Sequence, residues 1–135
     1  MSYNGPNPYV VNIEETTLMN DNFRMAVWTG RNLQLTVMSI EPDDSIGLEA
    51  HEDHDQFLRI EQGEAIVKMG KTECDLNEWR AHDDDAIFVP AGTWHDVINA
   101  GATPLKLYSI YAPAEHAHGT VHQTKADDPE RKNKE

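Results

Sequence analysis

A strand–turn–strand pattern over residues 85–99 constrains the fold of this chain more than any other part of its sequence. A short apolar run ends at Pro90, Gly92 follows two residues later, and His95 lies at the start of a second run. Proline fixes its own φ and glycine supplies backbone freedom, so the residues between the runs are expected to form a tight turn. Side chains alternate along a strand, which places His95 and Asn99 on one face. His95 is therefore expected to point into whatever the sheet encloses.

A second pattern lies upstream and ends at Gly63. Six residues separate Gly63 from Gln56, four separate Gln56 from His51, and Glu49 lies two positions before His51. The pattern is Glu49-x-His51-x4-Gln56-x6-Gly63. In extended backbone, residues two apart lie on the same face, so Glu49 and His51 can face one cavity.

The two patterns resemble the two conserved motifs of the cupin superfamily, in which the histidines bind a metal ion. The resemblance covers Gly47 to Asn99, more than a third of the chain. The chain has Glu49 where cupins usually have histidine, Gln56 where they usually have glutamate, and Asp84 where the second motif usually begins with glycine. The resemblance implies an all-β fold, a double-stranded β-helix or jelly-roll barrel.

By this resemblance, the residues at the metal-ligand positions are Glu49, His51, Gln56 and His95. The set keeps one negative charge, because glutamate and histidine have exchanged places and a neutral amide fills the remaining position. Two histidines and a carboxylate leave open coordination positions and suit Fe(II) or Mn(II), while Ni, Cu and Zn also remain open. Gln56 would be a weak fourth ligand or would orient a bound water. The sequence identifies no catalytic acid or base.

Each of these residues taken alone is more simply an ordinary surface or packing residue, and only their joint spacing favours a metal site. His54 is the main rival ligand, but the spacing places it in a loop between strands, so it is not included in the ligand set. The histidines His116, His118 and His122 allow a lid, a second metal site or an extension packed on the barrel, and the packed extension is favoured. Tyr108, Tyr111 and Arg59 are pocket candidates to which no role is assigned.

Short apolar runs separated by Gly, Pro and Asn predict strands almost throughout the chain and no long helix. The expected strands are 9–13, 23–28, 33–40, 56–61, 65–69, 86–89, 94–99 and 105–111, with a hairpin turn at 69–71 and a polar link at 82–85. One domain is expected over residues 1–115. Residues 116–135 are expected to form a C-terminal extension that is partly disordered, because its end is a charged run without apolar residues.

The chain has 135 residues and a formal net charge of −13, which argues against nucleic acid and anionic membranes as partners. Its one cysteine, Cys74, cannot form an internal disulfide, and its first residues do not resemble a signal peptide, so a cytoplasmic location is expected. Strands 33–40 and 105–111 are apolar on both faces. Either an N-terminal segment or a second subunit must cover the outer face, and the resemblance to small cupins favours a homodimer.

The resemblance to small cupins often described as like mannose-6-phosphate isomerase leaves the reaction open, because a fold does not fix a function. The first hypothesis is a metalloenzyme, of dioxygenase or isomerase type, acting on a small molecule in the barrel. The second is a non-catalytic module that binds a sugar or another small molecule, and the third is a structural dimer with a vestigial site.

Overall fold

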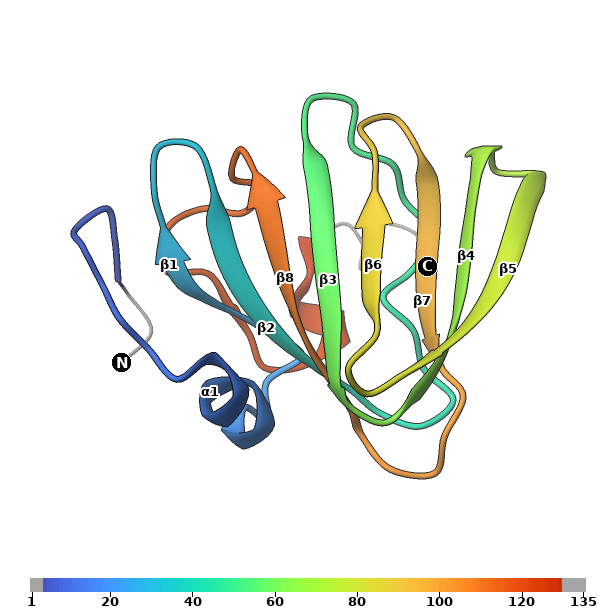
Figure 1. The fold of residues 1–135 in the computed structure, drawn as a ribbon, viewed down its shortest axis with the longest axis horizontal. Coiled ribbons are helices and arrows are strands. Elements are labelled where there is room, and N and C mark those ends of the chain that lie inside the picture. The colour runs from blue at the N-terminus through green and yellow to red at the C-terminus, as the bar shows by residue number, and fades with distance from the viewer. Residues whose placement is uncertain (1–3, 130–135) are drawn as a thin grey trace.

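The computed structural model describes residues 4–129 and shows two antiparallel sheets (Figure 1) whose buried residues share one apolar core. Six strands lie in the order β6-β3-β8-β2-β1-β9 and three in the order β5-β4-β7. The elements are α1 (Ile13–Met19), β1 (Arg24–Thr29), β2 (Gln34–Ile40), β3 (Asp55–Gln62), β4 (Glu64–Thr72), β5 (Asp75–His82), β6 (Ala86–Val89), β7 (Trp94–Asn99), β8 (Leu105–Ala112), β9 (Val121–His122) and a 3₁₀ turn, η1 (Lys125–Asp127). The all-β jelly-roll architecture expected from the sequence is confirmed.

The interior between the sheets is apolar at one end of the strands and polar at the other. Along β3 the inward positions run from Gln56 to Leu58 and Ile60, and all three are buried. Cross-strand neighbours share a face, and β8 follows the same order: Tyr111 pairs with Gln56, and Leu107 pairs with Ile60. The apolar end forms the main core, and the polar end contains the buried polar side chains of Gln56 and Tyr111.

The N-terminal segment differs from the expectation. Residues 9–12 form no strand, and α1 follows them. Asn12 caps this helix, since its side-chain oxygen accepts a hydrogen bond from the Glu15 amide at 2.9 Å. Ile13 packs on the outer-face cluster that includes Val37 and Tyr108. The helix therefore covers part of the outer face of β2 and β8. Cover by an N-terminal segment is one of the two alternatives that the sequence left open, the other being a second subunit.

The prediction of a hairpin turn at 69–71 is also wrong. β4 continues to Thr72, and the chain turns at Glu73 and Cys74 before β5. Gly70 lies within the strand, where a Cβ atom would be 1.9 Å from the Asp75 carbonyl oxygen. The glycine thus permits a close backbone approach rather than a turn.

Candidate metal centre

The backbone places Glu49 and His95 directly opposite each other. The Glu49 amide donates to the His95 carbonyl at 3.0 Å, and the His95 amide donates to the Glu49 carbonyl at 2.8 Å. Gly92, in the Pro-x-Gly turn with φ +80°, donates its amide to the His51 carbonyl at 2.7 Å. The two motifs are therefore joined by main-chain hydrogen bonds.

Asp84, where cupins usually have glycine, has φ +76°, a conformation that glycine adopts more easily.

Three side chains from the predicted set converge. The Glu49 Oε2 atom lies 3.4 Å from His51 Nε2 and 3.9 Å from His95 Nε2. One ligand atom from each residue lies within 4.8 Å of those of the other two. Glu49 and His95 are buried and the His51 side chain is 9% exposed. This group could hold a divalent metal ion.

The hydrogen bonding of His95 favours a metal ligand. Its Nδ1 atom lies 2.9 Å from the Thr93 carbonyl oxygen, which can only accept a hydrogen bond, so Nδ1 carries the proton. The Nε2 lone pair then points toward Glu49, and among residues 4–129 this atom has no hydrogen-bond partner. Burial lowers the pKa of His95, which favours the neutral form that binds metals. A buried imidazole lone pair beside a carboxylate fits a cation.

Gln56 lines the same interior but lies outside this His–Glu group. Its amide nitrogen donates to the Ser109 hydroxyl at 2.8 Å, and among the described residues its Oε1 atom has no hydrogen-bond partner. It pairs across the strands with Tyr111, whose ring lies edge-on to the His51 ring at 6.0 Å. The structure thus brings together Glu49, His51 and His95 and places Gln56 near them. The use of Gln56 as a ligand stays a prediction.

A second group, which the ligand set left out, consists of His51, His54 and Glu115. His54 lies in the loop before β3, as expected, but its ring stacks on His51 with centroids 4.9 Å apart. Glu115 Oε1 lies 3.0 Å from His54 Nε2 and 3.5 Å from His51 Nδ1. Glu115 follows β8 and belongs to neither motif, so spacing offered no signal for it.

Tyr111 is the other residue of this interior that received no role from the sequence. It is 1% exposed and contacts the rings of His51, His54 and His116. Burial raises its pKa to about 12, so the phenol keeps its proton at neutral pH and can donate a hydrogen bond. Tyr108 instead faces the outer apolar cluster.

The C-terminal histidines are packed differently from one another. The His116 ring contacts Tyr111, with centroids 5.3 Å apart, and burial lowers its pKa to about 3. His122 Nδ1 lies 3.2 Å from an Arg24 nitrogen, while His118 is exposed. Within residues 4–129, none of these three histidines belongs to either group of His and Glu side chains that could hold a metal ion. The described part of the extension contacts the barrel through His116 and His122.

Comparisons with known proteins agree with this architecture. A family model described as "Cupin domain" matches residues 36–111, more than half of the chain. The uncharacterised protein YrkC of Bacillus subtilis strain 168 is 62% identical over 124 residues, which cover 91% of this chain and 67% of YrkC. The crystal structure of BH2720 from Bacillus halodurans superposes with a TM-score of 0.93 at 55% identity, covering 94% of this chain and 97% of BH2720.

The oxalate decarboxylase of Bacillus subtilis, an enzyme with Mn(II) centres, shares the fold at 20% identity, with a TM-score of 0.59 over 64% of this chain and 23% of the enzyme. No helix among the described residues is long and apolar enough to cross a membrane. The matched family model and the similarity to YrkC together show that the chain belongs to the cupin family.

Proposed function

We propose that this protein is a metal-dependent enzyme of dioxygenase or isomerase type that acts on a small molecule inside the barrel. The observation that carries the proposal is the convergence of two imidazole Nε2 atoms on the Glu49 carboxylate in a buried site. Catalytic metal sites keep coordination positions open, and a set of two histidines and one carboxylate does so. A divalent transition metal such as Fe, Mn, Ni, Cu or Zn would supply Lewis acidity and those open positions.

The chain's own residues would orient the reactants. The Thr93 carbonyl fixes the His95 tautomer, and the protonated phenol of Tyr111 can donate a hydrogen bond to a substrate oxygen. The side-chain oxygen of Gln56, which has no hydrogen-bond partner within residues 4–129, can accept one from a substrate or a water. The formal charge of −13 disfavours polyanionic substrates at long range, so a sugar, a keto acid or an aromatic diol is the better candidate class.

The experiment begins with elemental analysis of tag-free protein. We expect a stoichiometric transition metal in the wild type and its loss in the double variant His51→Ala, His95→Ala. His118→Ala, which removes an exposed histidine, is the matched control and should keep the metal. His54→Ala should keep most of it, and full loss in that variant would contradict the assignment of the ligand set.

Activity is then measured with metal-loaded protein against sugars, keto acids and aromatic diols, with and without oxygen. Turnover should require the metal and disappear in His51→Ala. Turnover that survives metal removal would refute the proposal. Tight binding at the metal without conversion would instead support the second candidate, a non-catalytic binding module. The homodimer and the cytoplasmic location stay predictions.

A further inference from the structure

Glu115 approaches the metal-ligand candidate His51 from the side opposite Glu49. His51 presents Nε2 to Glu49 at 3.4 Å and Nδ1 to Glu115 at 3.5 Å. We propose that Glu115 is a positioning residue that holds the proton of His51 on Nδ1, so that Nε2 faces the metal. The inference rests on the proposed function, since it takes His51 as a ligand.

The two histidines of the group share this arrangement. His95 directs Nδ1 to the Thr93 carbonyl, and His51 directs Nδ1 to the Glu115 carboxylate, while both Nε2 atoms face Glu49. A ligating imidazole whose other nitrogen meets a carboxylate has a fixed tautomer and a more basic metal-binding nitrogen. The Glu115 side chain is 17% exposed, so solvent screens its charge only partly.

Glu115 is held in place by β2. The Gln34 side-chain oxygen accepts hydrogen bonds from the amides of Glu115 at 3.2 Å and His116 at 2.9 Å. The Gln34 side-chain nitrogen donates to the His116 carbonyl at 2.7 Å, and Gln34 is fully buried. The loop after β8 is thus fixed by three hydrogen bonds to one side chain, and the carboxylate is presented to His51 and His54.

A second ion between His51, His54 and Glu115 is the competing interpretation of the same residues. It would require His51 to bind an ion through each ring nitrogen and so to lose both ring protons. A neutral imidazole carries one proton, which makes the single ion with a supporting carboxylate the simpler arrangement. The stoichiometry of binding distinguishes the two.

The first test needs no metal. Long-range ¹H–¹⁵N NMR correlations of the apo protein should show a proton on His51 Nδ1, whether or not Nε2 also carries one beside Glu49. In Glu115→Ala the population protonated on Nε2 alone should rise, while the tautomer of His95 stays unchanged. Because this readout is independent of metal, it separates failure of the inference from failure of the proposed function, which the double histidine variant tests.

The second test measures Zn(II) affinity by competition with a chelator. Glu115→Ala should weaken binding by about 10–100-fold, and Glu115→Gln by less, because its amide oxygen keeps an acceptor without the charge. Glu73→Gln makes the same charge change in an exposed turn and should bind as the wild type. Unchanged affinity in Glu115→Ala, or two Zn(II) ions bound by the wild type, would overturn the inference.

Discussion

At the scale of single residues, the predicted ligand set is buried and carries only one negative charge. Glu49 supplies one carboxylate to the two imidazoles, and the usual cupin carboxylate is replaced by the neutral Gln56. A carboxylate at position 56 would attract a cation more strongly, but without the cation it would be a further buried charge. We therefore expect Gln56 to favour the stability of the metal-free protein at some cost in metal affinity.

Gln56→Glu tests this balance. The Ser109 hydroxyl can donate to the new carboxylate, but burial disfavours its charge, so the apo protein should lose about 1–3 kcal/mol of stability. Zn(II) should then raise the melting temperature of the variant by more than it raises that of the wild type. Differential scanning calorimetry of apo and loaded samples measures both effects. An equal metal-induced rise in the two proteins would mean that residue 56 does not reach the ion.

The sequence could predict the part of the site that depends on local geometry. Glu49 and His51 share a face because they are two apart, and the Pro-x-Gly turn places His95 beside them. Glu115 could not be found in this way, and Tyr111 was a pocket candidate to which the sequence assigned no role. Both reach His51 from β8 or the loop after it, and only the pairing of strands distant in sequence brings them together.

At the scale of elements, the C-terminal extension is tied to the barrel at several points. β9 pairs with β1, and Arg24 forms a buried ion pair with Asp128 at 2.7 Å. Lys125 contacts Asp44 at 2.8 Å. The extension is thus positioned by the barrel along most of its described length, and Glu115 lies immediately before it. The charged run that was expected to fray spans 125–135. Its first residues form η1 and include the buried Asp128, and residues 130–135 lie outside the described residues.

Gln34→Leu should loosen the start of this extension. The substitution removes the partners of the Glu115 and His116 amides, at a cost of about 1–3 kcal/mol for the unsatisfied groups. Hydrogen exchange should therefore accelerate at these two amides, while the β8 amide of Leu107 keeps its wild-type protection and serves as the internal control. Equal protection of Glu115 in variant and wild type would show that other contacts hold the loop.

His116 should make the extension sensitive to acid. Its pKa is about 3 in the folded protein, because the ring is buried, and Arg24, Glu49, Asp128, His122 and Tyr111 are the titratable groups that face it. The unfolded chain, with a histidine pKa of about 6.5, binds this proton first as the pH falls. Stability is therefore unaffected above about pH 6.5 and is lost between there and about pH 3.

By pH 5 the loss should be on the order of 2 kcal/mol, and His116→Gln should show a shallower decline. Urea unfolding of both proteins at pH 7 and pH 5 measures the difference. Parallel declines in the two proteins would show that His116 does not carry the acid sensitivity.

Elements without a periodic pattern were the ones that sequence could not predict. α1 is a single seven-residue helix, too short for an amphipathic repeat. β5 is exposed at most positions, so it lacks the alternation of apolar residues that indicates a half-buried strand. In contrast, β6 and β7 begin and end where the turn motif between them predicts.

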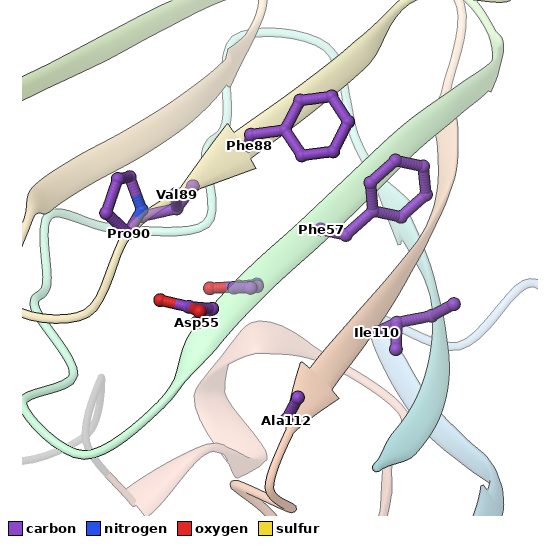
Figure 2. Close-up of a pocket in the computed structure, with 8 residues that line it drawn as sticks. Asp55, Phe57, Phe88, Val89, Pro90, Ile110 and Ala112 are labelled. Carbon is purple, nitrogen blue, oxygen red and sulfur yellow. The ribbon is translucent and has the colours of Figure 1, made fainter.

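At the scale of the whole molecule, an apolar surface on the outer side of the larger sheet remains uncovered. Phe57 on β3, Phe88 on β6 and Ile110 on β8 line one groove (Figure 2). We call these three residues the Phe88 surface. The rings of Phe57 and Phe88 lie 5.1 Å apart, and Phe88 is 68% exposed. β6 is also an edge strand of its sheet, and such edges can pair with another chain.

We therefore expect a second copy of the chain to cover the Phe88 surface in a symmetric dimer. Because each copy carries a formal charge of −13, repulsion should weaken the dimer at low ionic strength, and salt should strengthen it. Light scattering at micromolar concentration and moderate salt should give the dimer mass for the wild type and the monomer mass for Phe88→Asp. Val10→Asp, which makes the same kind of change at a side chain that is 97% exposed, is the control and should remain dimeric. A wild-type monomer would contradict the dimer itself, and a dimeric Phe88→Asp would place the interface elsewhere.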